Sequence, residues 1–138
     1  MINPEEFLAF LKERRSIRSY LDRKISDKEI LIGISKIAFY GKHIKRAPLA
    51  IAIVGKIKEN PNYYIQDTSL VSMNMMLMAW SLGIGTCWIG SMNREKAKEI
   101  LGLEKDDYFL TILPMGYIKG NIPKPTMRKA LDQIKKEI

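Results

Sequence analysis

The sequence has few of the residues that most metal sites and catalytic triads require. Its 138 residues include one histidine, His43, and one cysteine, Cys87. A zinc site with several His and Cys ligands is therefore excluded, as are an internal disulfide and a CxxC redox pair. Cys87 lies in an apolar stretch, which predicts a buried small side chain, and His43 lies in a basic loop, which predicts a solvated one. We expect no metal site and no catalytic side chain.

Long apolar runs and leader-like features are also scarce. The N-terminus lacks a basic stretch followed by an apolar run, so we expect no secretory signal, and the single cysteine favours the cytoplasm. Residues 68–93 contain no charge and are long enough to cross a bilayer. Because polar residues and glycines interrupt this stretch, it predicts a buried helix followed by a buried strand and no membrane partner.

The length and the net charge limit the number of domains and the kinds of partner. A chain of 138 residues with 46% hydrophobic content predicts one domain over residues 1–138. The net charge of +8 indicates an anionic partner, which leaves nucleic acid, a phosphate-bearing cofactor and an acidic membrane open. Aromatic residues are poorly interleaved with the basic ones, which argues against a nucleic-acid interface.

Helix and strand signals occur in mixed order, which predicts an α+β fold. The expected helices are capped or closed by Asn3, by the Ser26–Glu29 capping box, by Asp67 or Thr68, and by Asn93 with Gly102. The expected strands are residues 49–54, 86–89 and 108–117, with Pro114 at an edge or a bulge. The tail from Met127 fits either a helix or an extended segment on a partner. The helix over residues 68–82 is apolar on every side, which suggests a dimer built around it.

Two segments could bind a ligand. Arg14, Arg15, Ser16 and Arg18 place three guanidiniums and a hydroxyl within five residues, which suits a phosphate, although solvated cations at a helix C-terminus are an equal alternative. The glycines of residues 83–90 permit close backbone approach to a ligand, but a tight helix-to-strand connection with a core Trp88 explains them as well. A third basic group, Lys124, Arg128 and Lys129, fits a solvated face.

The order of these motifs resembles the FMN-dependent nitroreductase family. The resemblance rests on five elements: Arg14-Arg15-Ser16-Ile17-Arg18 with Tyr20, Gln66-Asp67 before the long helix, residues 82–90, Leu101-Gly102-Leu103, and Pro114-Met115-Gly116-Tyr117 with the basic tail. It implies a mainly antiparallel sheet flanked by helices and a homodimer with the long helix at its interface. FMN would be held by Arg14, Arg15, Ser16 and Arg18, by the backbone at Ile89 and Gly90, and by Arg128.

The resemblance also implies an activity and a difference. Family members pass electrons from NAD(P)H through FMN to a small acceptor, such as a nitroaromatic, a quinone or a flavin, by a ping-pong route. They usually carry an Asn-x-Gln-Pro-Trp-like segment after the second helix, whereas residues 4–59 here contain no Asn, Gln or Trp. The sheet is therefore expected to have fewer strands. A flavin-binding protein without turnover remains the alternative function.

Overall fold

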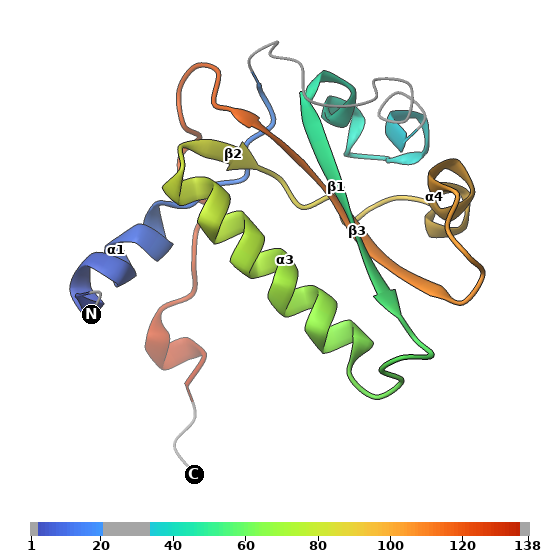
Figure 1. Ribbon diagram of the computed structural model, residues 1–138. Helices are drawn as coiled ribbons and strands as arrows, with labels where there is room; N and C mark the ends of the chain where they lie inside the picture. The colour runs from blue at the N-terminus through green and yellow to red at the C-terminus, as the bar shows by residue number, and fades with distance from the viewer. Residues whose placement is uncertain (1–2, 21–33, 136–138) are drawn as a thin grey trace.

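The fold is a small antiparallel sheet with helices on both faces, seen in the computed structural model, which describes residues 3–20 and 34–135 (Figure 1). The sheet has the order β1-β3-β2, with β1 at Leu49–Lys56, β2 at Ile84–Thr86 and β3 at Asp107–Tyr117. The other elements are α1 (Pro4–Glu13), a 3-10 turn η1 (Lys42–Arg46), α3 (Tyr64–Ser81), α4 (Arg94–Leu101) and a 3-10 turn η2 (Leu131–Gln133). The predicted α+β class with a reduced, antiparallel sheet is confirmed.

Two of the predicted helix boundaries are confirmed by their caps. The Asn3 side chain accepts a hydrogen bond from the Glu5 amide at 2.9 Å, and α1 begins at the next residue, Pro4. Asn93 caps α4 in the same way, and Gly102 ends that helix in the left-handed region with φ of 65°. The Ser26–Glu29 capping box lies outside the described residues; residues 34–37 are helical.

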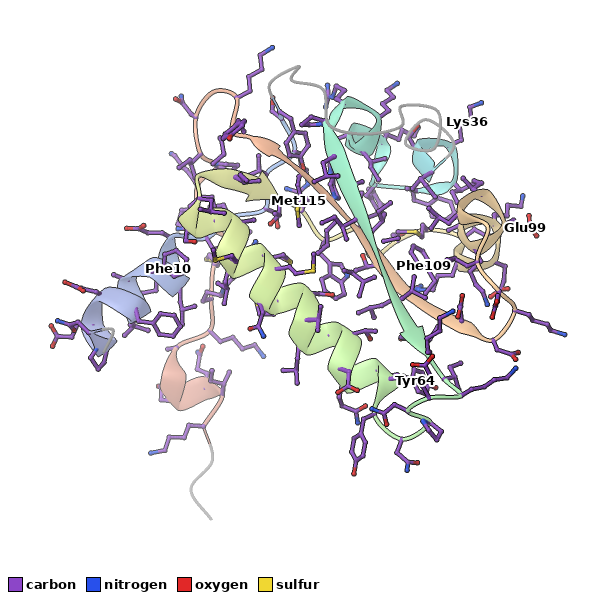
Figure 2. All side chains as sticks on the ribbon, in the orientation of Figure 1. Phe10, Lys36, Tyr64, Glu99, Phe109 and Met115 are labelled. Atoms are coloured by element: carbon purple, nitrogen blue, oxygen red, sulfur yellow. The ribbon has the colours of Figure 1, made fainter. Side chains whose placement is uncertain are left out.

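The start of α3 corrects the prediction that Asp67 or Thr68 caps it. The helix begins at Tyr64, and Thr68 uses its hydroxyl to donate to the Tyr64 carbonyl at 2.6 Å, one turn back. Packing explains the earlier start, because the Tyr64 ring meets Tyr108 of β3 edge to face with centroids 4.8 Å apart. Figure 2 shows Tyr64 at the end of α3 that this contact holds.

Strand β2 also differs from the prediction, which placed it at residues 86–89. Gly83 adopts φ of 71° and turns the chain so sharply that pairing with β3 begins at Ile84. Pro114 lies in the central strand, neither on an edge strand nor at the sheet's bulge, which falls between Ile53 and Val54. Because β2 pairs only with residues 115–117, β3 has a single neighbouring strand at Pro114, and the proline is accommodated there.

The sheet separates two apolar clusters. On one face Phe109 and Ile112 of β3 pack with Ala97 of α4 and with Ile34 and Ile44. On the other face α3 contributes Met76 to a cluster with residues of β1 and β3 that include Leu113 and Met115. Figure 2 shows Phe109 beside α4 and Met115 near β2, in line with these two groups. The strands therefore carry apolar side chains on both faces.

The helix α3, predicted from its apolar residues to need a second copy for complete cover, is buried by its own chain on one face only. Its buried residues are Thr68, Ser72, Met76 and Ala79, which form the stripe against the sheet. The opposite face is exposed although it is apolar, and it includes Leu70, Met73 and Met78. An apolar face of this kind needs a cover that one chain does not supply. No helix in the described part of the chain combines the length and hydropathy needed to cross a bilayer.

Candidate functional site

The segment after α1 is fixed alongside β2. The Ile17 amide donates to the Thr86 carbonyl at 2.7 Å, and Ser16 forms a parallel bridge with Thr86. Tyr20 then donates its hydroxyl to the Ile17 carbonyl at 2.6 Å. Ile17 is 2% exposed, so its side chain anchors the segment in the core. Because extended residues alternate in direction, Ser16 and Arg18 lie on the side opposite to Ile17.

Three guanidiniums gather where this segment leaves α1. Arg14 is the C-cap residue of the helix, and burial lowers its pKa, with the positive charges of Arg128 and Arg15 acting in the same direction. The influence of Arg128, more than one hundred residues away in the sequence, places the tail beside this cluster. The structure therefore brings Arg14, Arg15 and Arg128 together, as a binding site for one anion would require.

Two guanidinium nitrogens of this cluster are buried without a hydrogen-bond partner among the described residues. They are Nη1 of Arg14 and Nε of Arg15. Arg15 uses its Nη1 to donate to the backbone carbonyls of Lys12 and Arg14, the latter at 2.9 Å, so part of this side chain closes the end of α1. Arg128 donates to the Thr126 hydroxyl. A buried unpaired donor is costly unless a ligand accepts from it, which favours an anion at this point.

A small cavity adjoins the basic segment. Its volume is about 80 Å³, and it is bounded by Arg18 and by two stretches of chain, residues 40–43 and residues 87–91. The Ile89 carbonyl accepts a hydrogen bond from the buried Thr111 hydroxyl at 2.9 Å, which fixes the backbone at this edge. A Cβ added at Gly90 would meet only the Trp88 ring, at an ordinary contact distance of 3.7 Å, and Gly90 is exposed, so its backbone is accessible to a ligand. Ile89 itself is buried and offers only its backbone.

Cys87 is buried, as the sequence predicted. Burial raises the pKa of its thiol, although the Arg18 and Arg14 guanidiniums and a hydrogen bond with the Ser16 side chain act in the opposite direction. The thiol is therefore protonated at neutral pH and packs as a small apolar group beneath the basic segment. It contributes no nucleophile. Within residues 3–20 and 34–135, no three His, Cys, Asp or Glu side chains lie close enough to hold a metal ion.

His43 corrects the prediction of a solvated loop histidine. Residues 42–46 form the 3-10 turn η1, which directs His43 and Ile44 inward and leaves Lys42 and Lys45 exposed. His43 is 8% exposed and borders the cavity with Arg18. Burial lowers its pKa, and the positive charges of Arg18 and Arg46 lower it further.

Sequence reasoning thus proposed the basic segment, residues 14–18, and the backbone at Ile89 and Gly90, but it missed the third side of the cavity. That side consists of Tyr40, Gly41 and His43. The sequence offered one signal for this side, the four-residue spacing of His43 and Ala47, which is typical of one face of a helix. Both residues are buried. The basic residues around His43 concealed this signal. The other predicted cations, Lys124 and Lys129, are exposed, as expected for a solvated face.

Comparison with known proteins gives this geometry a context. The model of the Nitroreductase family matches residues 33–117, which is over half of the chain and includes Ile89 and Gly90. A protein of Methanothermobacter thermautotrophicus that carries the provisional name NADH dehydrogenase/NAD(P)H nitroreductase is 26% identical over 155 residues, covering 87% of this chain and 81% of that protein. Since 87% of this chain is about 120 residues, that relative carries about 35 residues with no counterpart here. An absent segment would produce such a difference.

Solved structures show the same fold. A provisionally named NADH dehydrogenase/NAD(P)H nitroreductase from Parabacteroides distasonis superposes with a TM-score of 0.84 at 21% identity, covering 94% of this chain and 96% of that one. A protein from Clostridium difficile, described as an FMN-dependent nitroreductase, superposes with a TM-score of 0.75 at 26% identity, covering 86% of this chain and 91% of that one. The second neighbour is named for its cofactor.

Proposed function

This chain belongs to the nitroreductase family, and from that premise we propose that it is an FMN-dependent oxidoreductase. It would take electrons from NADH or NADPH and pass them to a small acceptor, such as a nitroaromatic, a quinone or a free flavin, by a ping-pong route. One observation carries the proposal: the buried, unpaired guanidinium nitrogens of Arg14 and Arg15 lie in a cluster with Arg128. The neighbour named as FMN-dependent supports it.

The residues present fit FMN. Its phosphate needs several fixed donors, which the unpaired nitrogens of Arg14 and Arg15 supply together with Arg128. Ser16 follows on the same extended segment and would hold the ribityl chain, and Arg18, which borders the cavity, would reach the flavin ring. The open backbone edge at Ile89 and Gly90 would approach the flavin ring near N5. This edge is held rigidly by the Thr111 hydroxyl, so the protein can position the ring.

The division of labour follows from these assignments. FMN, when bound, would supply the redox chemistry between the nicotinamide and the acceptor. The protein's part is to hold the phosphate with guanidiniums, to place positive charge from Arg18 beside the ring and to limit water with the buried side chains around the cavity. Cys87 is protonated and buried and needs no role in the reaction.

We further propose that the working form is a homodimer of single-domain chains over residues 1–138, located in the cytoplasm. The exposed apolar face of α3, with Leu70, Met73 and Met78, supports the dimer, because burying it against a second copy removes it from water. Residues 119–130, which follow β3, are exposed and offer a surface that a second copy could contact. The unpaired Cys87 supports a reducing compartment.

The test of the proposed function is spectroscopic. Purified protein, soaked in excess FMN and desalted, should show a flavin absorption band, and anaerobic NADH or NADPH should bleach it. Addition of a nitroaromatic, a quinone or free flavin should then restore the band. A protein that takes up no FMN would contradict the proposal.

The second candidate is a flavin-binding protein without turnover. It is favoured by one observation, the absence of about 35 residues that the Methanothermobacter relative carries. Under this alternative the flavin band appears but persists with both nicotinamides, even when a chemical reductant such as dithionite bleaches it. The bleaching step therefore separates the two candidates.

A further inference from the structure

His43 is the one polar side chain at the cavity that the proposed function leaves unused and whose free atom is buried. It is 8% exposed, and its Nε2 is buried without a hydrogen-bond partner among the described residues. It shares the cavity with Arg18 and with the Ile89–Gly90 backbone. A buried imidazole nitrogen beside a cavity is expected to pair with whatever enters that cavity.

The hydrogen bond on the other side of the ring determines what Nε2 can do. His43 bonds to the Tyr40 backbone in a way that favours the protonated ring, so the ring donates there and the Tyr40 carbonyl accepts. Since Nε2 has no partner, the donor is Nδ1. Burial and the nearby Arg18 and Arg46 guanidiniums keep the ring neutral. A neutral imidazole with its proton on Nδ1 presents Nε2 as an acceptor.

The size of the cavity limits which part of a ligand can reach His43. About 80 Å³ is far below the volume of roughly 300–1,000 Å³ that encloses a whole ligand, so only one edge of a planar molecule enters. The pyrimidine edge of a flavin presents a carbonyl oxygen, the N3–H group and a second carbonyl oxygen in sequence. Arg18 offers donors and His43 offers an acceptor, so the two side chains are complementary to a carbonyl beside an N–H group.

We propose that His43 is a further cofactor-binding residue, whose Nε2 accepts a hydrogen bond from the N3–H group of the flavin. This inference rests on the proposed function, because it requires FMN in the site. It assigns recognition of the pyrimidine edge to a residue of η1. His43 is a binding residue in this account and takes no part in hydride transfer.

The direct test compares FMN with 3-methyl-FMN, in which a methyl group replaces the N3 hydrogen. Dissociation constants are measured by fluorescence titration of the flavin-free full-length protein. The wild type should bind FMN roughly three- to tenfold more tightly than the analogue, the equivalent of one hydrogen bond. His43→Ala should bind both flavins about equally, whereas His43→Gln, whose side-chain carbonyl can accept, should keep part of the preference. Lys45→Ala, an exposed cation on the same turn, should keep all of it.

The outcomes separate this inference from the proposed function. Failure of the wild type to bind FMN would overturn both. FMN binding with the same preference in the wild type and His43→Ala would overturn the role of His43 alone. If His43→Ala does not fold, the NMR titration of wild-type His43 with and without FMN decides, because it needs no variant.

A second readout uses the fact that His43 is the only histidine. Its ring nitrogens give one set of signals in NMR spectra of the labelled protein, so its protonation is observed without assignment. The groups that face it are Arg18, Arg46, the Tyr40 backbone and Cys87. FMN should lower the pKa of His43 further, because accepting from N3–H requires the neutral ring. A rise or no change on adding FMN would overturn the acceptor role.

Discussion

Arg14 differs from the other cations near the site in its surroundings. It is half-buried at the end of α1, its Nη1 is buried and unpaired, and two other guanidiniums lie close enough to lower its pKa. Such a cluster is unfavourable in the ligand-free chain and becomes favourable when a phosphate neutralises it. The sequence motif proposed these residues, but the burial that distinguishes a binding site from a solvated helix end depends on the docking of residues 16–20 against β2.

Arg14→Ala should therefore weaken FMN binding by about 1.5–3 kcal/mol, the value of a charge-assisted hydrogen bond, which is roughly ten- to a hundredfold in the dissociation constant. Fluorescence titration measures it. Lys96→Ala removes the same charge from an exposed position on α4 and is the matched control. Equal affinities for the two variants would show that Arg14 does not contact the phosphate.

The burial of His43 leads to a prediction about the stability of the flavin-free protein. Its pKa is lowered in the folded chain by burial and by Arg18 and Arg46, so folding favours the neutral ring. The stabilisation is present above the unfolded pKa of about 6.5 and is lost as the pH falls below it. The free energy of unfolding of the flavin-free protein should thus fall between about pH 7.5 and pH 5.5, and His43→Gln should flatten this part of the profile. Urea titrations at several pH values measure this free energy. The same dependence on pH in the wild type and in His43→Gln would refute the effect.

At the scale of elements, contact between residues 16–20 and β2 decides whether the site exists. Gly85 lies against the Ile17 side chain so closely that an added Cβ would be 2.6 Å from it. Only glycine allows the segment to approach β2 and form the bond from Ile17 to Thr86. The two segments that we propose to hold FMN are therefore joined by a packing contact rather than by a loop.

Two glycine variants distinguish packing from ligand contact. Gly85→Ala should destabilise the protein by about 1–3 kcal/mol, through overpacking against Ile17, and should weaken FMN binding as well. Gly90→Ala should leave stability within about 0.5 kcal/mol, because an added Cβ would meet the Trp88 ring at 3.7 Å, an ordinary contact distance, and should weaken FMN binding alone. Thermal unfolding and fluorescence titration of both variants provide the measurements. Full FMN affinity in Gly90→Ala would contradict the close approach of the flavin to this edge.

Elements with strong local signals were predictable from sequence, and those fixed by tertiary contact were not. Asn3, Asn93 and Gly102 act through hydrogen bonds and backbone angles within a few residues, so the bounds of α1 and α4 followed from them. The start of α3 depends on a Tyr64–Tyr108 contact across 44 residues, which no local pattern encodes. Likewise, the burial of the His43 side chain depends on the packing of η1 against the core.

At the scale of the whole molecule, the chain presents an apolar surface that it cannot cover. Leu70 of α3 is 65% exposed and Met78 is 61% exposed, away from the buried stripe of that helix. The all-round apolar character of this helix, visible in the sequence, led to the expectation of a dimer built around it. The single chain covers one face of the helix, and we infer that a second copy covers the other.

Leu70→Lys should disrupt the proposed dimer, because an unpaired ammonium would lose its water on burial. Light scattering should give twice the 15.9 kDa chain mass for the wild type and a value near the chain mass for the variant. Ile100→Lys on α4, against the other face of the sheet, is the control and should stay dimeric. A monomeric wild type would contradict the dimer.

The central claim is that this chain, without about 35 residues that its relative carries, still binds FMN and reduces it with a nicotinamide. The most direct measurement is the visible absorption spectrum of the FMN-soaked and desalted protein, followed by anaerobic addition of NADPH and then NADH. We predict a flavin band that one of the two nicotinamides bleaches and that a quinone restores. A protein that remains colourless after soaking in FMN would contradict the account.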